Sequence, residues 1–233
     1  MKRSNIDFMA GKDSGQNVFM LTSFNPGSGK SFLAMNIAMS FAIKKKRILV
    51  IDGDLRHGST SSYVDSPKTG LSDYLGNRVS DWKEIIVKDE KYDNLHIIPI
   101  GTVPPNPTEL LEDGKLATLI EVLRSEYDYI FIDCPPIDIV ADAQIIEKLA
   151  DRTVFVVRSG LLDRSMLPEL ENIYQEKRFK NLSVILNGTE SAGGRYGYRY
   201  GYRNGYSSYY GNKGKMDGHQ VIDFACYRSR KNF

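Results

Sequence analysis

Val18-Phe19-Met20-Leu21, followed closely by the turn Phe24-Asn25-Pro26-Gly27-Ser28-Gly29-Lys30-Ser31, is the stretch that decides the fold. The apolar run predicts a buried β-strand. After the turn, Leu33, Ile37 and Phe41 recur at a spacing of four, which predicts the core-facing side of a helix from residue 30 to 43. Strand, glycine-rich turn and helix in this order indicate a binding loop at the start of a helix.

Gly27 and Gly29 give this loop its predicted chemistry. Without a Cβ, they let the backbone turn several N–H groups toward one point, where the positive end of the following helix also lies. Such a nest binds phosphate oxygens, the Lys30 ammonium neutralises the β and γ phosphates, and the Ser31 hydroxyl ligates the accompanying magnesium. We therefore predict a site for ATP and Mg²⁺ formed by Pro26, Gly27, Ser28, Gly29, Lys30, Ser31 and Phe32.

The match to the phosphate-loop pattern G-x-x-x-x-G-K-[ST] is incomplete, because its first glycine falls on Phe24. The alternative is an ordinary glycine turn before a helix. Two acidic strand ends further along the chain favour the phosphate loop, since nucleotide chemistry needs carboxylates near the metal.

These acids are Asp52 and Asp54, after the apolar run 48–51, and Asp133, after the run 129–132. The carboxyl ends of parallel strands gather at one edge of a sheet, beside the phosphate loop. We expect Asp133 to hold magnesium, with Ser31 and Asp52 as further ligands, and Asp52 or Asp54 to orient or deprotonate a nucleophile. A lone aspartate after a strand is otherwise a turn or helix-capping residue.

Arg56 follows the same strand end, and the sequence leaves two roles open for it. In the first role Arg56 is a catalytic residue beside Lys30 and its guanidinium contacts phosphate. In the second role the guanidinium pairs with Asp54.

Apolar runs that alternate with helical segments predict an α/β fold. Strands are expected at 18–22, 48–51, 97–100, 129–132, 154–157 and 182–186, with helices at 30–43, 116–126, 141–150 and 165–177. This alternation implies a doubly wound, mostly parallel sheet of the P-loop NTPase type with helices on both faces.

Three regions are expected: an N-terminal arm over 1–16, a nucleotide-binding domain over 17–189 and a tail over 190–233. The stretch 193–211 holds seven of the fourteen tyrosines and almost no aliphatic residue. It cannot build a core, so we predict a disordered tail.

Composition narrows the functional classes. With 41% hydrophobic residues, the 233-residue chain can bury a full core. A net charge of +2 provides no field for nucleic acid, and two cysteines far apart in sequence fit a reducing cytoplasm. No apolar stretch approaches the roughly 20 residues of a membrane span, so a soluble cytoplasmic chain is expected.

Ile48-Leu49-Val50-Ile51-Asp52-Gly53-Asp54-Leu55-Arg56 is similar to the second Walker motif, Walker A′, of the bacterial tyrosine kinases (BY-kinases). Three further motifs resemble those of the same family. The phosphate loop, Pro26-Gly27-Ser28-Gly29-Lys30-Ser31, is similar to the family's version, which often lacks the first glycine. The other two are the proline element, Pro104-Pro105-Asn106-Pro107-Thr108-Glu109-Leu110-Leu111, and the Walker B motif, Ile132-Asp133-Cys134-Pro135-Pro136. With the tyrosine-rich tail, the resemblance covers roughly residues 3–210.

The resemblance implies ATP-dependent autophosphorylation in trans, between copies, on tail tyrosines. The expected phosphoacceptors are Tyr196, Tyr198, Tyr200, Tyr202, Tyr206, Tyr209 and Tyr210. It also implies that Asn187, at the end of the last strand, helps to recognise the purine.

The family further implies partners: the chain itself, a membrane polysaccharide co-polymerase or membrane-spanning half as activator, and a tyrosine phosphatase. The setting is polysaccharide export at the cytoplasmic face of the membrane. Family members form rings through an N-terminal Glu-x-x-Arg-x-x-Arg helix, of which only Arg3 matches the last arginine here. The arm over 1–16 is therefore interpreted as the remnant of an oligomerisation helix.

Two other classes compete with the kinase. A cell-division or plasmid-partition switch ATPase shares the strand-end aspartates, but carries a lysine early in the loop, where this chain has Asn25-Pro26, and lacks a tyrosine cluster. The second competing class is a protein whose tail tyrosines stack on single-stranded nucleic acid. Three arginines in the tail, Arg195, Arg199 and Arg203, are too few cations for this role, and the role would not explain the phosphate loop.

Overall fold

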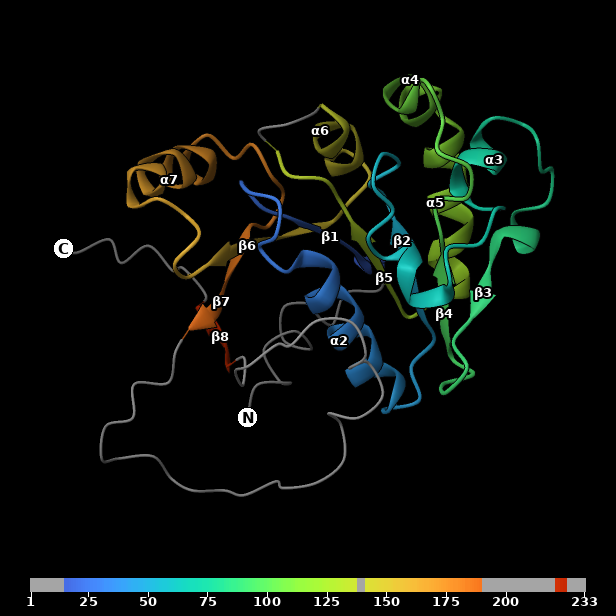
Figure 1. Ribbon diagram of the computed structural model, residues 1–233, viewed down its shortest axis with the longest axis horizontal. Helices are drawn as coiled ribbons and strands as arrows, with labels where there is room; N and C mark the ends of the chain where they lie inside the picture. Colours follow the sequence, from blue (N-terminus) through green and yellow to red (C-terminus); the bar gives the residue numbers. More distant parts are fainter. Residues whose placement is uncertain (1–14, 138–140, 190–220, 226–233) are drawn as a thin grey trace.

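A computed structural model describes residues 15–137, 141–189 and 221–225 (Figure 1). Within these residues the strands form one sheet in the order β3-β4-β2-β5-β1-β6-β7-β8. Their bounds are β1 Val18–Thr22, β2 Ile48–Asp52, β3 Val87–Lys88, β4 Leu95–Ile98, β5 Tyr129–Asp133, β6 Arg152–Arg158, β7 Ser183–Thr189 and β8 Val221–Ala225. The pairings from β4 to β7 are parallel, which confirms the predicted α/β sheet.

Both edges of the sheet carry an antiparallel strand that the sequence did not predict. At one edge β3 pairs with β4, and at the other β8 pairs with β7, with Thr189 opposite Val221. The predicted disordered tail is thus corrected at Val221–Ala225, which forms β8. The rest of the tail and residues 1–14 of the predicted arm lie outside the described residues.

Helices cover both faces of the sheet (Figure 1). Alternate strand residues divide into two buried clusters: Phe19 and Val50 pack with α2, whereas Met20 and Ile132 pack with helices on the other face. The helices are α2 Lys30–Ala42, α3 Leu71–Leu75, α4 Pro107–Glu112, α5 Lys115–Glu126, α6 Asp142–Glu147 and α7 Leu167–Gln175, with short 3₁₀ turns η1 Ser61–Val64, η2 Trp82–Ile85 and η3 Arg164–Met166.

The helix after the glycine-rich loop forms as predicted. Leu33, Ile37 and Phe41 are all buried against the sheet. The helix ends one residue before the predicted boundary, at Ala42. Elsewhere, predicted elements occur with shifted ends: the strand expected at 97–100 is β4 at Leu95–Ile98, and the helix expected at 141–150 is reduced to α6.

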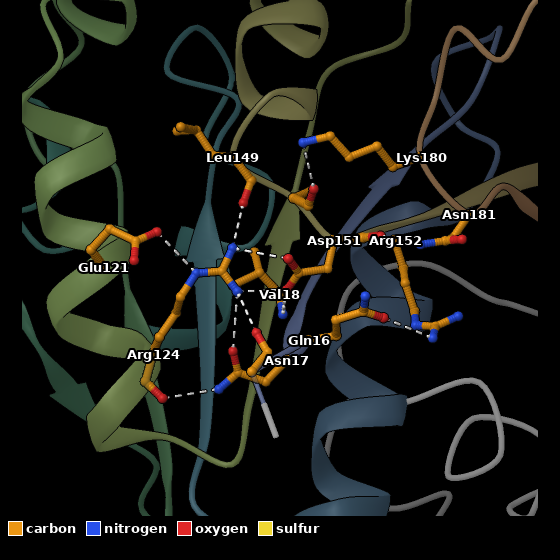
Figure 2. A network of polar contacts seen from close by, with 12 residues as sticks. Gln16, Asn17, Val18, Glu121, Arg124, Leu149, Asp151, Arg152, Lys180 and Asn181 are labelled. Carbon is orange, nitrogen blue, oxygen red and sulfur yellow. Dashed lines mark hydrogen bonds and ion pairs between the residues drawn. The ribbon is translucent and has the colours of Figure 1, made fainter. Parts of the chain in front are cut away.

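A polar network fixes the start of β1, the strand that leads into the loop (Figure 2). The Arg124 guanidinium donates to both carboxylate oxygens of Asp151, at 2.6 and 3.1 Å, and to the Leu149 carbonyl oxygen. The Asn17 amide donates to the Arg124 and Tyr127 carbonyls, and the Val18 N–H donates to Asp151. The network therefore joins α5, the α6–β6 connection and the amino end of β1, which is the end of the strand opposite the loop.

No helix within the described parts of the chain is both long and apolar enough to cross a membrane.

Candidate active site

The loop between β1 and α2 has the backbone that its glycines predict. Gly27 and Gly29 have φ angles of 75° and 90°, in the left-handed region that favours glycine, and α2 begins directly after Gly29. A Cβ on Gly29 would lie 2.4 Å from the Asn187 amide nitrogen, so no larger residue fits there without displacing Asn187.

Phe24, which replaces the first glycine of the general pattern, belongs to the core. Its side chain is only 2% exposed and meets the Phe155 ring edge-on, with the ring centroids 4.9 Å apart. The aromatic ring therefore anchors the beginning of the loop to β6.

Side chains at the ends of β6 and β7 bind the outer side of the loop. Arg158 and Asn187 are neighbours in the parallel register. The Arg158 guanidinium donates to the Gly27 carbonyl at 2.7 Å, and the Asn187 amide donates to the Ser28 carbonyl at 2.9 Å. With both carbonyl oxygens held by these donors, the loop keeps the turned backbone that a phosphate nest requires.

Asn187 thus has a role that the sequence did not predict. The side chain is buried, and its carbonyl oxygen accepts a hydrogen bond from the Gly188 N–H at 2.9 Å. Its predicted contact with a purine stays a prediction. Sequence reasoning also missed Arg158, whose guanidinium contacts Gly27, 131 residues earlier in the chain.

Asp52 and Asp133 come together as predicted, because they stand opposite each other at the ends of β2 and β5. Both side chains are buried, at 0% and 1% exposure. One oxygen of Asp52 accepts from the Ser61 N–H and hydroxyl, each at 2.7 Å, and one oxygen of Asp133 accepts from the Thr60 hydroxyl at 2.7 Å. The second oxygen of each acid, Oδ1, is buried and has no hydrogen-bond partner among the residues that the structure describes.

Burial and mutual repulsion shift the protonation of these acids. Burial, and then the charge of Asp133, raise the pKa of Asp52 to about 7, although the Ser61 hydrogen bonds oppose this. Burial also raises the pKa of Asp133, against the effects of the Ser31 and Thr60 hydroxyls and the Lys30 ammonium. Two confined negative charges of this kind are stabilised by a cation.

Lys30 lies in the same electrostatic environment. Burial lowers the pKa of its ammonium group, while Asp133 and Asp54 act in the opposite direction. The structure therefore brings Lys30, Asp52 and Asp133 together, as the sequence predicted.

Asp54 lies just beyond, in the turn after β2, and is 8% exposed. Its Oδ1 accepts from the backbone N–H groups of Arg56 and His57 and lies 3.3 Å from the His57 ring nitrogen Nδ1. The aspartate therefore closes this turn in addition to facing the loop lysine.

The possible pairing of the Arg56 side chain with Asp54 is wrong. Its Nε donates to Asp142 at 3.2 Å, and its Nη2 donates to the Thr108 hydroxyl at 3.0 Å. Thr108 in turn donates to Asp142 at 2.6 Å. Arg56 thus joins the turn after β2 to α4, which begins in the proline element, and to α6.

The oxygen atoms of Asp52, Asp133 and Ser31 suit a divalent cation whose remaining ligands do not come from the protein. No group of three or more His, Cys, Asp or Glu side chains that would hold a metal by themselves occurs among the residues the structure describes. Mg²⁺ in nucleotide sites is commonly held by one or two carboxylates together with phosphates and water. The two orphaned oxygens of Asp52 and Asp133 match that requirement, and Ser31 lies beside Asp133.

Comparison with known proteins decides the family. A family model described as an AAA domain matches residues 17–162. Tyrosine-protein kinase CpsD of Streptococcus agalactiae is 34% identical over 217 residues, which is 92% of this chain and 88% of CpsD. Tyrosine-protein kinase YwqD of Bacillus subtilis is 35% identical over 199 residues, 84% of this chain and 82% of YwqD.

The chain belongs to the bacterial tyrosine-protein kinases. Among solved structures, the kinase domain of Escherichia coli tyrosine kinase ETK superposes with a TM-score of 0.75 at 31% identity, covering 86% of this chain and 77% of that one. The enzyme class expected from the motifs, protein-tyrosine kinase, is therefore confirmed.

A protein of the competing class resembles this chain in fold. The septum site-determining protein MinD of Pyrococcus horikoshii, solved with Mg-ADP, gives a TM-score of 0.59 at 21% identity over 72% of this chain and 68% of that one. This likeness confirms the P-loop NTPase fold and carries no functional argument. The tail tyrosines of the bacterial kinase lie outside the described residues, so their predicted role is untested.

Proposed function

We propose that this bacterial tyrosine kinase transfers the γ-phosphoryl group of ATP to tail tyrosines of another copy of the same chain. The observation that carries the proposal is the pair of buried, in-register aspartates with unpartnered oxygens, Asp52 and Asp133, beside Lys30 of the loop. Relatives named as tyrosine-protein kinases support the acceptor class.

The loop from Pro26 to Phe32 binds the phosphates through backbone N–H groups, while Arg158 and Asn187 hold its carbonyls on the outer side. Ser31, Asp52 and Asp133 would hold Mg²⁺, which when bound neutralises phosphate charge. The Lys30 ammonium stabilises the charge that spreads over the transferred group.

The acceptor step breaks the bond from the γ-phosphorus to its bridging oxygen and forms a bond to a tyrosine oxygen. The tyrosine proton passes to a carboxylate, and Asp52 or Asp54 is the group proposed to accept it. Arg56 acts, in this proposal, by positioning the turn that carries Asp54.

The number of residues in the tyrosine-bearing segment is compatible with transfer between chains. All seven acceptor tyrosines lie between Thr189 and Val221, which pair across β7 and β8. The middle of this segment is about 16 residues from either strand and therefore extends at most roughly 50 Å from the sheet edge. This length permits a tyrosine to reach a neighbouring copy in a homo-oligomer.

Further partners follow from the family alone. We propose a membrane polysaccharide co-polymerase, or a membrane-spanning half, as activator at the cytoplasmic face of the membrane, and a tyrosine phosphatase as the reversing enzyme. The process served would be capsule or exopolysaccharide synthesis and export.

Incubation of the purified chain with Mg-ATP, followed by intact-mass measurement and phosphotyrosine mapping, tests the function. The proposal requires mass increments of phosphate on tyrosines between 196 and 210. ATP hydrolysis with nucleotide-dependent dimerisation and no phosphotyrosine would instead indicate a switch ATPase.

A further inference from the structure

Thr60 and Ser61 belong to a segment that no motif marks, yet both contact the acids of the site. The Thr60 hydroxyl donates to Asp133 Oδ2, and the Ser61 hydroxyl and N–H donate to Asp52 Oδ2, each at 2.7 Å. Both residues are buried, at 0% and 1% exposure. Two consecutive residues thus bind two acids that come from different strands.

We propose that Thr60 and Ser61 are positioning residues that hold Asp133 and Asp52 in the orientation in which they receive a divalent cation. In each acid the hydroxyl binds Oδ2, and Oδ1 is buried with no partner within the described part of the chain. A carboxylate turns easily about its last side-chain bond, so a fixed donor on one oxygen also fixes the other. This inference rests on the proposed function, because it assigns the free oxygens to the metal that accompanies ATP.

The chemistry of a hydroxyl suits this task better than that of a cation. An arginine or lysine at either position would neutralise the acid and compete with Mg²⁺ for it. A neutral hydroxyl satisfies one oxygen and leaves the negative charge available.

The two hydroxyls are themselves held in place. The Ser61 oxygen accepts the N–H of Ile100, at 2.9 Å, so it links Asp52 to the end of β4. The Thr60 carbonyl accepts the N–H of Tyr63 at 3.1 Å, and the Ser61 carbonyl accepts the N–H of Ser66 at 2.9 Å. Turn η1 therefore presents both donors from a backbone fixed to the sheet.

Thr60→Val is the sharpest test, because it removes the hydroxyl and preserves the shape of the side chain. Binding of a fluorescent ADP is measured in the full chain as a function of Mg²⁺ concentration and again in EDTA. Loss of an outer partner of a metal ligand typically costs about 10- to 100-fold in metal affinity. We expect Thr60→Val to need at least about 10-fold more Mg²⁺ than the wild-type chain for the same ADP binding, while its ADP affinity in EDTA stays within about twofold of the wild-type value. Thr60→Ser keeps a hydroxyl and should show the wild-type Mg²⁺ requirement.

Ser62→Ala is the matched control. Its hydroxyl donates to the Ser59 carbonyl at 2.7 Å, in the same segment and away from the acids. This variant should keep the normal Mg²⁺ requirement. Thr60→Ala and Ser61→Ala are measured in the same series, and where Thr60→Val does not fold they decide by the same criterion.

A normal Mg²⁺ requirement in the folded Thr60 and Ser61 variants would overturn the inference, as would an equal loss of ADP affinity with and without Mg²⁺. The assay involves no phosphoryl transfer. A wild-type chain that binds Mg-ADP but modifies no tyrosine would therefore contradict the proposed function and leave the positioning test intact.

Discussion

Replacing Asp52 by asparagine should stabilise the metal-free protein, because it removes one of two buried like charges. Burial and the Asp133 charge raise the pKa of Asp52 from 3.8 to about 7. Between these two values the folded protein binds a proton that the unfolded chain has released, so stability falls as the pH rises. The raised pKa of Asp52 destabilises the folded state by about 4 kcal/mol at pH 8, where the folded protein carries it ionised, and by about 2 kcal/mol at pH 5.5, where the folded protein carries it protonated, as order-of-magnitude values.

The assay is urea unfolding in EDTA at pH 8 and pH 5.5. Asp52→Asn should raise the free energy of unfolding at pH 8, and its gain should be about 2 kcal/mol larger there than at pH 5.5. Exposed Asp65, in the following segment, offers the control Asp65→Asn, which should show no comparable dependence on pH. A gain that is absent at pH 8, or equal at the two pH values, would refute the electrostatic reasoning. Asp52→Asn should also bind ATP much better than it transfers phosphate.

Three further changes probe the loop and its support. Lys30→Met should lower the phosphotransfer rate about 10²- to 10³-fold with an unchanged unfolding midpoint, and near-normal phosphotyrosine would exclude the assigned role. Gly29→Ala should destabilise the protein by about 1–3 kcal/mol, because the φ angle at this position is 90° and the new Cβ would collide with the Asn187 side chain. The same change should abolish ATP binding measured by calorimetry, and a normal ATP affinity would contradict this. Arg124→Met should cost about 2–4 kcal/mol in urea unfolding, because Asp151 loses its cationic partner and keeps only the Val18 N–H as a donor from this network, and activity per folded molecule should be retained. An unchanged midpoint would show that the network is not structural.

Sequence periodicity predicted the parts of the fold where burial dictates the residue pattern. Apolar runs such as 48–51 and 129–132 are buried on both sides of a parallel sheet, so they become strands that end at the predicted acids. Strand β3 was missed because Val87–Lys88 is too short to show a period. Strand β8 was missed because five residues that are apolar apart from Asp223, after a long polar stretch, do not reveal their partner, β7.

Site residues were predictable where residues of the required chemical type stand at a recognisable spacing in the sequence. Loop glycines, Lys30 and the strand-end aspartates meet this condition. Thr60 and Arg158 do not, since their partners Asp133 and Gly27 lie 73 and 131 residues away. Ser61 is 9 residues from its partner Asp52, and none of the three belongs to a recognisable motif. Arg56 lies in a motif, but its partner Asp142 comes from α6, 86 residues further along the chain, which local reading cannot find.

Phosphate transfer between two distinguishable copies tests the central claim most directly. One copy keeps the active site and carries phenylalanine in place of the seven tyrosines between 196 and 210, so it cannot modify itself there. The other is the full chain with Lys30→Met, which keeps the tyrosines. After mixing with Mg-ATP, mass spectrometry should find phosphotyrosine between 196 and 210 on the Lys30→Met chain, and none when that chain is incubated alone. An unmodified Lys30→Met chain, beside a wild-type chain that phosphorylates its own tail under the same conditions, would contradict transfer between copies.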